Sequence, residues 1–456
     1  MSCFLTIYKI QYFCLGGGGP FFLINMETVE IKDIGRYLGV EVEIRGWVFN
    51  KRSSGAIAFL QLRDGTGRLQ AVVSKSGVAE ESWRAAEEAT IESSVVVSGR
   101  VKADGRSESG FELEALSVTV IQKAEEYPIG KKKHGVDFLQ DVRHLWLRTA
   151  RQEAILRIRD EVEFALREFF HSRGFVLTDS PIFTANAVEG TTELFEVNYF
   201  DRKAYLSQSG QLYQEAASAA LRKTYCFGPT FRSEKSKTRR HLTEFWMLEA
   251  EVSFMDWQDN MQLQEDMIVF ALKRVLEKRA DDLKVLERQI SPLAAAAEGS
   301  FPRLDYDEAI DRLRALGSDI KAGDDLGGDD ETILTKQFDR PIFIHHYPAA
   351  IKAFYMKSDP ERPDRALCSD LLASEGYGEI IGGSQRVDDL AELQKRIRAH
   401  SLPEEAFKWY LDLRRYGSVP HSGFGIGLER TVAWICGLEH VREAIPFART
   451  IHRLEP

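Results

Sequence analysis

The sequence has no closely spaced pair of cysteines and no hydrophobic run long enough to cross a membrane. Its five cysteines are widely separated and form no CxxC pair, which argues against a disulfide framework and against a structural zinc site. A membrane-spanning helix needs about 20 consecutive apolar residues, and no segment approaches that length. We therefore expect a protein without membrane spans that works in the reducing cytoplasm.

The sequence also has no excess of positive charge and none of the common nucleotide-binding glycine motifs. It contains 60 lysines and arginines against 70 acidic residues, a net charge of −10. This balance excludes a generally basic protein that coats nucleic acids, but it leaves local basic sites open. Neither a GxxxxGK[ST] loop nor a strand–GxGxxG–helix element occurs, which excludes P-loop and Rossmann domains.

Residues 1–25 differ in composition from the rest of the chain. They contain no acidic residue, a single lysine (Lys9) and a run of four glycines. Lys9 interrupts the apolar stretch and no A-x-A cleavage site follows, so the segment does not fit a secretory signal. We interpret it as an upstream extension and expect translation to start at Met26.

Residues 26–123 predict a small β-barrel. Apolar and polar residues alternate in five short segments, separated by turn signals and accompanied by one helical stretch, AEESWRAAEEA. The five segments are EVEIRGWVF, AIAFLQLRD, RLQAVV, SVVVSGRV and FELEALSVTVI. Five strands in about 100 residues are typical of an all-β OB-fold barrel. Residues 124–150 contain Pro128, two glycines and the lysine run 131–133, which predicts a hinge.

Residues 151–456 predict an α+β domain with an antiparallel sheet, because helical and strand-like segments alternate irregularly. Helices are expected from residue 151 to Gly174, from 259 to 281, and from Glu429 through TVAWICGLEHVREA. The acidic tract GDDLGGDDE predicts a solvated turn within an insertion around 286–340. In the apolar strand RPIFIHHYP, we expect both histidines to have packing roles.

A local positive charge lies in the segment FRSEKSKTRRHLTEFWMLEAE, which begins at Phe231. Its apolar ends and charged middle predict a strand–loop–strand hairpin. Arg232 and Glu234 lie two apart and are expected to face the same way on one strand. A guanidinium binds phosphate bidentately, a carboxylate accepts from an exocyclic amine, and Phe245 offers a stacking face. A solvated loop is the alternative, but a purine triphosphate would use all three groups.

The segment HSGFGIGLER, starting at His421, combines three alternating glycines with a helix that opens at Glu429 and Arg430. Glycines in a strand allow another molecule to approach the backbone, although a tightly packed strand has the same pattern. Together with the Arg-x-Glu hairpin, this segment indicates a nucleotide site.

These segments resemble the class II aminoacyl-tRNA synthetases. FRSE with its basic loop and TEF is similar to motif 2, GFGIGLER to motif 3, and FHSRGFVLTDSPIF to motif 1, the dimer-forming element. The barrel is similar to the anticodon-binding domain of the aspartyl, asparaginyl and lysyl subgroup. AVEGTTELFEV, YLSQSGQLY, IKAFYMK, GEIIGGSQR and IPFART resemble the asparaginyl-tRNA synthetases from about residue 26 to the end.

The resemblance implies a homodimer that uses ATP, Mg²⁺, L-asparagine and tRNA(Asn). Asparaginyl-adenylate would form first, and its asparaginyl group would then pass to the 3′-terminal adenosine of the tRNA. Arg232 and Arg430 would stabilise the charge that develops on the phosphates, and Glu379 would bind Mg²⁺. Gly382 stands where aspartyl relatives often have serine, which leaves the second metal ligand open. The implied ATP site comprises Arg232, Glu234, Arg240, His241, Phe245, Glu379, Gly427, Glu429 and Arg430.

The resemblance also implies an amino-acid site of Glu189, Gln211, Glu215 and Arg386. Glu189 and Gln211 would hold the α-ammonium group, and Arg386 would face the side-chain carbonyl oxygen. Aspartyl enzymes typically read QSPQLYKQ, whereas this chain reads QSGQLYQE, with Gln214 in place of the lysine and Glu215 after it. Losing the lysine cation and gaining the glutamate anion disfavours binding of aspartate and favours an amide NH₂. Glu215 is therefore expected to recognise the side-chain amide of the substrate.

Two alternatives to asparagine activation remain at this stage. One is an aspartyl-tRNA synthetase, either specific for its own tRNA or also charging tRNA for asparagine. The other is a paralogue that charges no tRNA, such as an ammonia-dependent asparagine synthetase or a regulatory binding module, but such relatives lack the barrel.

In the barrel, Arg52, Phe59 and Gln70 match the anticodon-reading positions of the subgroup. An aromatic ring stacks on an unpaired base and an amide hydrogen-bonds to its edge. The alternative for Phe59 is a place in the barrel core. The lysine run 131–133 fits either a contact with the tRNA backbone or a solvated hinge.

Overall fold

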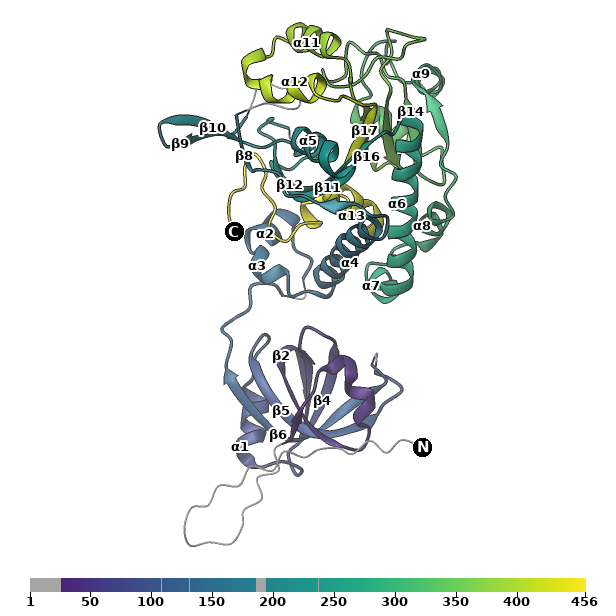
Figure 1. The fold of residues 1–456 in the computed structure, drawn as a ribbon. Helices are drawn as coiled ribbons and strands as arrows, with labels where there is room; N and C mark the ends of the chain where they lie inside the picture. The colour runs from purple at the N-terminus through teal and green to yellow at the C-terminus, as the bar shows by residue number, and fades with distance from the viewer. Residues whose placement is uncertain (1–25, 108, 131, 186–193, 237) are drawn as a thin grey trace, which may run out of the picture. The chain divides into compact units, whose positions relative to one another are not determined.

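The structure, a computed structural model, describes residues 26–107, 109–130, 132–185, 194–236 and 238–456. The chain divides into two compact units between His134 and Gly135 (Figure 1). No helix in these described ranges is both long and apolar enough to cross a membrane. The predicted extension, residues 1–25, lies outside the described residues.

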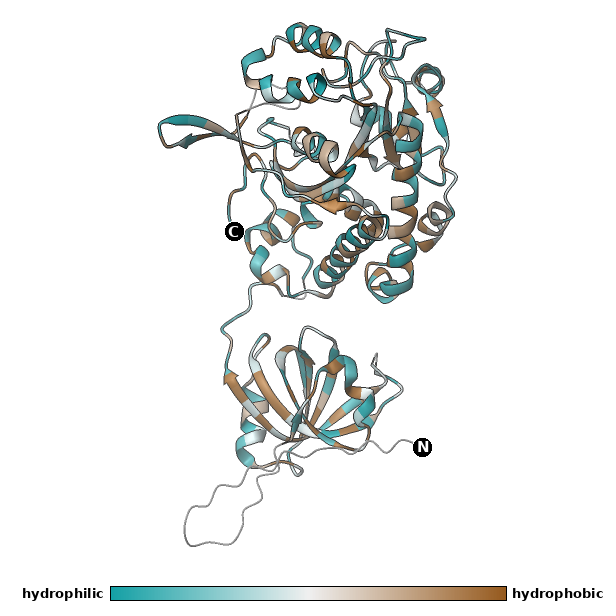
Figure 2. Cartoon of the chain, in the orientation of Figure 1, coloured by the Kyte–Doolittle hydropathy of each residue, from teal (hydrophilic) through white to brown (hydrophobic). Residues whose placement is uncertain are grey.

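The smaller unit is a closed barrel with the strand order β1-β2-β3-β4-β6-β5, completed by pairing of β2 with β5. Its elements are β1 (Glu27–Thr28), the 3₁₀ helix η1 (Ile31–Tyr37), β2 (Glu41–Ser54), β3 (Ile57–Arg63), β4 (Arg68–Ser74), α1 (Glu80–Glu88), β5 (Ser94–Ala103) and β6 (Phe111–Gln122). Alternate residues of β3, such as Ala58, Leu60 and Leu62, are buried, and the residues before each of them are half-buried or exposed. Hydrophobic and hydrophilic residues both occur along the barrel strands (Figure 2). The OB-fold prediction is confirmed.

The larger unit contains an eight-stranded sheet with the order β13-β14-β15-β16-β17-β12-β11-β7. The strands are β7 (Val176–Leu177), β11 (Lys223–Phe231), β12 (Glu244–Ser253), β13 (Arg303–Asp305), β14 (Ile342–His345), β15 (Cys368–Ala373), β16 (Gly378–Gln385) and β17 (His421–Gly427). All neighbours are antiparallel except β13–β14 and β11–β7. A small sheet is formed by β8 (Phe183–Thr184), β10 (Arg202–Leu206) and β9 (Glu196–Tyr199). The α+β prediction is confirmed.

Helices cover the large sheet, and a common core of apolar side chains joins α4, α6 and α13 to its central strands. The helices are α2 (Val136–Asp141), α3 (Arg143–Trp146), α4 (Ala150–Ser172), α5 (Gln211–Leu221), α6 (Trp257–Lys278), α7 (Ala280–Val285), α8 (Ile290–Ala297), α9 (Tyr306–Ala315), α10 (Gly328–Thr335), α11 (Leu390–Ala399), α12 (Lys408–Arg415) and α13 (Leu428–Cys436), with 3₁₀ turns η2 (Glu404–Phe407) and η3 (Val441–Glu443). Helix α4 ends before Gly174, whose φ of +76° permits the left-handed turn expected there.

Two predicted helices are shorter in the structure. The helix predicted over 259–281 breaks at Arg279, which turns to form a 3.0 Å ion pair with Glu161 of α4. Helix α13 stops at Cys436 because Gly437 adopts a φ of +70°. Of the residues that follow, Val441–Glu443 form the 3₁₀ turn η3 rather than part of a continuing helix.

The segment 124–150 is not a hinge along its whole length. From residue 136 it forms α2 and α3, which belong to the larger unit. Arg143 is almost fully buried and donates hydrogen bonds to the carbonyl oxygens of Pro446 (2.9 Å) and Ile445 (3.0 Å). The sequence contains no signal for this pairing, because the partners lie about 300 residues away.

Candidate active site

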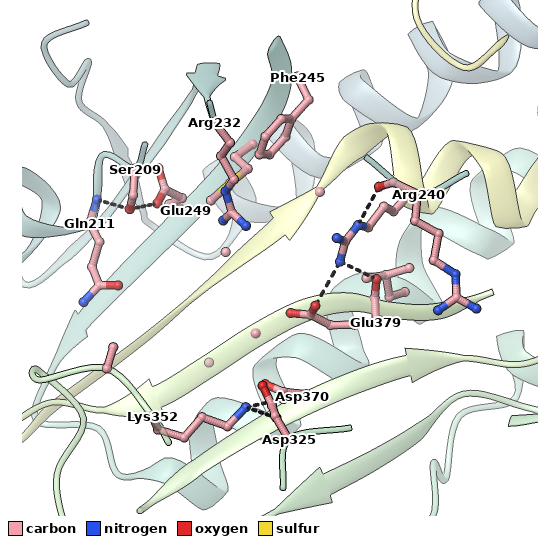
Figure 3. Close-up of a pocket in the computed structure, with 18 of the residues that line it drawn as sticks. Ser209, Gln211, Arg232, Arg240, Phe245, Glu249, Asp325, Lys352, Asp370 and Glu379 are labelled. Carbon is pink, nitrogen blue, oxygen red and sulfur yellow. Dashed lines mark hydrogen bonds and ion pairs between the residues drawn. The ribbon is translucent and has the colours of Figure 1, made fainter. Parts of the chain in front are cut away.

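A cavity of about 350 Å³ opens over strands β12, β16 and β17 of the larger unit (Figure 3). Gly425 and Gly427 line it, in agreement with the prediction that glycines here admit a ligand. Gly423 has a different reason to be glycine, because a Cβ atom there would overlap the carboxylate of Glu251. Two glycines of β17 thus leave space for the cavity, and the third leaves space for the buried side chain of Glu251.

Five predicted ATP-site residues meet at one end of the cavity: Arg232, Arg240, His241, Phe245 and Arg430. The Arg232 guanidinium carbon lies 5.3 Å from the centre of the Phe245 ring. Strand β11 ends at Phe231, so Arg232 and Glu234 lie in the loop and not on one strand as predicted. Glu234 is not among the described residues that line the cavity, so its role toward the adenine amino group stays a prediction.

Burial, aided by the neighbouring arginines, keeps His241 neutral. Burial lowers the pKa of His241 to about 4, and the nearby charges of Arg430 and Arg232 act in the same direction. At neutral pH the ring therefore offers a hydrogen-bond donor and an acceptor without adding charge. The positive charge at this end of the cavity therefore comes from the arginines.

Arg430 and Arg240 are held by acidic residues. Arg430 Nη1 donates to Glu379 Oε2 at 2.9 Å and to the Glu379 carbonyl oxygen at 3.1 Å. Arg240 forms a 2.6 Å ion pair with Glu331 of α10. Glu331 belongs to the acidic tract predicted as a solvated turn; the prediction holds for the exposed residues 323–325 and is wrong for Gly328–Glu331, which form the start of α10.

Glu429 has a different position from that expected of a nucleotide ligand. Its two carboxylate oxygens already accept hydrogen bonds, one from Arg159 Nη1 of α4 (2.7 Å) and one from the backbone N–H of Trp246 on β12 (3.0 Å). Glu429 touches the cavity but ties α4 and α13 to the sheet. Its role as an ATP ligand stays a prediction.

Two carboxylates face one point on the cavity floor and supply the oxygen ligands that Mg²⁺ prefers. A Cβ atom placed on Gly382 would lie 3.1 Å from Glu379 Oε1 and 3.6 Å from Asp370 Oδ1. Asp370 also accepts a 2.9 Å hydrogen bond from Lys352 Nζ, with Asp325 at 3.5 Å from the same nitrogen. Asp370 was not predicted as a site residue, because nothing in the sequence indicates that β15 places it beside Glu379.

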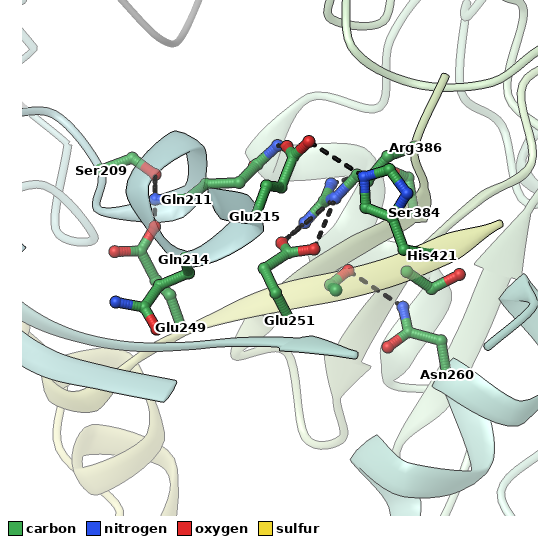
Figure 4. A network of polar contacts seen from close by, with 12 residues as sticks. Ser209, Gln211, Gln214, Glu215, Glu249, Glu251, Asn260, Ser384, Arg386 and His421 are labelled. Carbon is green, nitrogen blue, oxygen red and sulfur yellow. Dashed lines mark hydrogen bonds and ion pairs between the residues drawn. The ribbon is translucent and has the colours of Figure 1, made fainter. Parts of the chain in front are cut away.

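The opposite end of the cavity carries polar groups for a small zwitterion. Ser209 and Gln211 line it together with Glu249 of β12, which accepts hydrogen bonds from the Ser209 hydroxyl and, at 2.6 Å, from the backbone N–H of Gly210. Arg386 lines the same end, is almost fully buried and is paired with Glu251 (Figure 4). Glu189, the predicted α-ammonium ligand, lies outside the described residues.

Glu215 lies behind the cavity wall rather than on it. Its fully buried carboxylate accepts hydrogen bonds from Arg414 Nη2 (2.7 Å), Tyr410 (2.8 Å) and Gln211 Nε2 (3.1 Å), and it lies 3.1 Å from His421 Nε2. Burial by itself would raise the pKa of Glu215, but the Arg414 and His421 interactions outweigh it and hold the pKa below its ordinary value. Glu215 therefore reaches the cavity only through Gln211, its neighbour one turn earlier in α5.

Gln214 does not face the cavity either. Its amide donates to the carbonyl oxygen of Thr178 (2.8 Å) and to the hydroxyl of Ser180 (3.1 Å), and it accepts from Thr178 Oγ1 (2.7 Å). The direct comparison of this position with a substrate-binding lysine is therefore wrong for this chain. Successive side chains of a helix point about 100° apart, so only one face of α5 reaches the substrate end.

Replacing Gln214 with lysine should destabilise the protein without creating aspartate activation. The substitution removes three buried hydrogen bonds and buries a charge, so we expect the free energy of unfolding to fall by about 1–3 kcal/mol. Urea unfolding and amino-acid-dependent exchange of pyrophosphate into ATP would measure the two effects. Lysine at the exposed Gln258 of α6 is the matched control. Exchange with aspartate in Gln214→Lys would contradict this structure-based interpretation.

The three predicted anticodon residues come together on the barrel. Arg52 Nη2 donates to Gln70 Oε1 at 3.1 Å, and the Arg52 guanidinium lies 4.6 Å from the centre of the Phe59 ring. Phe59 is only half-buried, whereas its neighbours Ala58 and Leu60 point into the core. The core interpretation of Phe59 is thus excluded, and the three side chains form one outward surface across β2, β3 and β4.

Comparison with known proteins agrees with this architecture. Residues 136–451 match the family described as tRNA synthetases class II (D, K and N), and residues 42–121 match the OB-fold nucleic acid binding domain. A barrel followed by an antiparallel-sheet domain with this arginine-lined cavity is thus the arrangement of a class II tRNA synthetase.

Relatives of high similarity narrow the assignment. The asparagine–tRNA ligase of Pelotomaculum thermopropionicum is 57% identical over 94% of this chain and all of its own length, and that of Thermus thermophilus is 56% identical with the same coverage. The Pyrococcus horikoshii asparaginyl-tRNA synthetase, solved with asparaginyl-adenylate, has a TM-score of 0.92 and 46% identity over 94% of this chain and 100% of its own. The aspartyl-tRNA synthetase of Entamoeba histolytica has a TM-score of 0.82 and 28% sequence identity. The chain belongs to the asparagine–tRNA ligase family within the class II synthetases.

Proposed function

We propose that this protein uses ATP to activate asparagine as asparaginyl-adenylate and then transfers the asparaginyl group to the 3′-terminal adenosine of tRNA(Asn). The observation that carries the proposal is a single cavity with an arginine-rich end and a polar end that holds Arg386, in a chain 46% identical to a protein solved with asparaginyl-adenylate. A phosphate chain fits the first end and a small amino acid fits the second.

In the first step a carboxylate oxygen of asparagine attacks the α-phosphorus of ATP. A new O–P bond forms, the bond from the α-phosphorus to the pyrophosphate oxygen breaks, and pyrophosphate leaves. The hydroxyl of the terminal adenosine then attacks the carbonyl carbon of the mixed anhydride, and AMP leaves. No side chain acts as a nucleophile. Arg232 and Arg430 stabilise negative charge on the phosphate oxygens, and the cavity holds the reactants in line.

The residues present fit a hard divalent cation, because Glu379 and Asp370 offer carboxylate oxygens on adjacent strands. When bound there, Mg²⁺ neutralises charge on the phosphate oxygens. Arg430 keeps the Glu379 carboxylate oriented toward the cavity through the 2.9 Å ion pair. The proposed second Mg²⁺ ligand is therefore Asp370, in place of a serine at the position of Gly382.

Selectivity for the amide follows from charge balance around Arg386. Glu251 pairs with this guanidinium, and Glu215, behind Gln211, pairs with Arg414, so each buried arginine here already has a carboxylate partner. A substrate carboxylate would enter a region with no surplus positive charge, whereas a neutral carboxamide accepts from Arg386 without that cost. We propose that Glu215 acts by orienting Gln211 rather than by reading the amide directly.

Pyrophosphate exchange into ATP, measured with asparagine and aspartate side by side, tests the proposed function. Exchange with asparagine and none with aspartate is the expected result. Exchange with aspartate would favour the aspartyl-tRNA synthetase alternative, and exchange with neither amino acid would refute activation.

Replacing Phe59 with alanine should weaken tRNA binding and leave amino-acid activation unchanged. Stacking of a base on an aromatic side chain contributes about 1–3 kcal/mol, so the KM for tRNA(Asn) should rise by roughly 5- to 150-fold. Aminoacylation kinetics and pyrophosphate exchange would separate the two effects. Alanine at the exposed Ile121 of β6 is the control. An unchanged KM in Phe59→Ala would show that this surface does not read the anticodon.

We also propose a homodimer that works in the cytoplasm, where aminoacylation supplies protein synthesis. The motif 1 region supports the dimer, because Phe164 of α4 and both residues of the edge strand β7, Val176 and Leu177, are exposed. The edge of β7 leaves backbone groups available for pairing. Sedimentation equilibrium of the full chain should give twice the monomer mass of 51.8 kDa.

A further inference from the structure

We propose that Asp305, His345 and His346 form a binding site for a zinc-like divalent ion, separate from the carboxylates that face the ATP end. One carboxylate oxygen of Asp305 and the Nδ1 atoms of both histidines lie within 4.8 Å of one another. No other group of at least three histidines, cysteines or acids with this proximity occurs in the described part of the chain. Two imidazoles and one carboxylate are a ligand set suited to Zn²⁺ and its neighbours rather than to Mg²⁺.

The backbone brings the two neighbouring histidines to the same side. Successive residues of a strand point to opposite faces, and His345 is the last residue of β14. His346 follows with a φ of +59°, which reverses the alternation and places the two Nδ1 atoms 2.6 Å apart. A left-handed conformation is unfavourable for a residue other than glycine and recurs where a site requires it. Both rings also pack against Trp257, with ring centres 5.4 Å and 4.5 Å apart, so the expected packing role is confirmed and the proposed site would be additional to it.

Asp305 reaches the pair because β13 lies beside β14, with Asp305 directly opposite His345 in the parallel register. Its Oδ2 atom is 3.9 Å from His345 Nδ1 and 3.7 Å from His346 Nδ1. The other oxygen, Oδ1, accepts from the backbone N–H of Asp307 at the start of α9, which fixes the carboxylate. All three groups are partly or largely shielded from solvent, but His345 and Asp305 remain accessible to an ion.

Each of the three side chains has a polar or charged neighbour that a bound ion would have to accommodate. His345 Nδ1 and His346 Nδ1 share a 2.6 Å hydrogen bond, which an ion bound to both nitrogens would replace. His346 Nε2 lies 3.6 Å from Asp359 Oδ2, the arrangement in which a carboxylate orients a metal-binding imidazole. Arg362 donates to Asp305 Oδ2 at 2.8 Å, so an ion bound to this oxygen would replace the arginine there.

Bound metal would tie β13 and α9 to the end of β14. Tyr347, the next residue, lines the active-site cavity, so the ion would stabilise one of its walls. The absence of CxxC pairs excludes a thiolate zinc site but not one built from histidine and aspartate. The ion would have three protein ligands and a remaining position for water.

Titration of chelator-stripped full-length protein with Co²⁺, in the presence of excess Mg²⁺ to occupy the carboxylate site, tests the proposal. We expect one equivalent of Co²⁺ to give the intense visible absorption of a four-coordinate imidazole site, and Zn²⁺ to displace it. His345→Gln should abolish the signal. Asp305→Asn keeps the helix-capping oxygen and should weaken binding at least about 10-fold, and Asp359→Asn by about 10- to 100-fold.

His400→Gln is the matched control, because His400 is half-buried outside the cluster and should leave Co²⁺ binding unchanged. Thermal unfolding without metal shows whether each variant folds, and Asp359→Asn tests the site even if His345→Gln does not fold. Absence of the four-coordinate spectrum in the wild-type protein would overturn the proposal. So would an unchanged Co²⁺ affinity in folded His345→Gln.

Discussion

Replacing Arg232 with alanine is expected to lower asparagine-dependent pyrophosphate exchange by about two to three orders of magnitude. Arg232 lies at the arginine-rich end of the cavity, with its guanidinium beside Phe245. Charge accumulates on the α-phosphate oxygens as pyrophosphate leaves, and a positioned guanidinium stabilises that charge more than it stabilises ground-state ATP. The loss should therefore appear mainly in kcat and less in the KM for ATP, measured by steady-state exchange kinetics.

Two variants show whether the effect is specific to this site. Lys235→Ala removes an exposed cation three residues away in the same loop and should change the rate by less than about threefold. Arg232→Lys keeps the charge but loses the bidentate geometry, so its rate should fall between those of the wild-type protein and Arg232→Ala. A rate near wild type for Arg232→Ala, with an unchanged melting temperature, would contradict the assignment of this residue.

Replacing Glu215 with glutamine is expected to reduce the free energy of unfolding by about 3–5 kcal/mol. Its carboxylate is fully buried against Arg414, Tyr410 and His421, so neutralising it leaves the Arg414 charge without a partner. Urea unfolding monitored by tryptophan fluorescence would measure the loss. Exchange kinetics should also show a raised KM for asparagine, because Gln211 loses the acceptor that orients it.

The stability difference between wild type and Glu215→Gln should also depend on pH. The pKa of Glu215 is held below its ordinary value in the folded protein. Its stabilising contribution is therefore present above the unfolded-state pKa and is lost as the pH falls toward the lower folded-state pKa. The difference in stability between wild type and Glu215→Gln should consequently shrink in acid. A difference that grows as the pH falls would show that the carboxylate is not ionised in the folded protein.

A double variant and a surface variant are the controls. Glu215→Gln combined with Arg414→Met removes both charges and should recover part of the stability lost in the single variant. Glu277→Gln neutralises an acid whose side chain is 70% exposed and should alter stability by less than about 0.5 kcal/mol. Equal losses from the Glu215 and Glu277 substitutions would mean that burial of the carboxylate is not the cause.

The barrel strands, the α4 helix and the hairpin of β11 and β12 were predictable because local patterns encode them. Ala58, Leu60 and Leu62 alternate with outward residues along β3, and a period of two specifies a strand with one buried face. Gly174 ends α4 through its own backbone preference. The family of the chain was also predictable, since the motif 2 and motif 3 residues are close together in the sequence.

The composition of the site wall depended on contacts between distant segments. Asp370 lies beside Glu379 because β15 pairs with β16, and Glu331 reaches Arg240 from α10, 91 residues further along the chain. An acidic tract has the same local pattern whether it is solvated or folded over a cavity. Which state forms depends on whether a buried cation is available to pair with the acid.

The motifs, the alternation of the barrel strands and the helix-ending glycines thus specified the architecture and the class of reaction, because each acts through neighbouring residues. Tertiary structure decided the direction of individual side chains. Gln214 turns toward Thr178 and Glu215 toward Arg414, since a helix rotates about 100° per residue and the surrounding elements determine what each face meets. The same holds for His345 and His346, which meet Asp305 only because β13 lies beside β14.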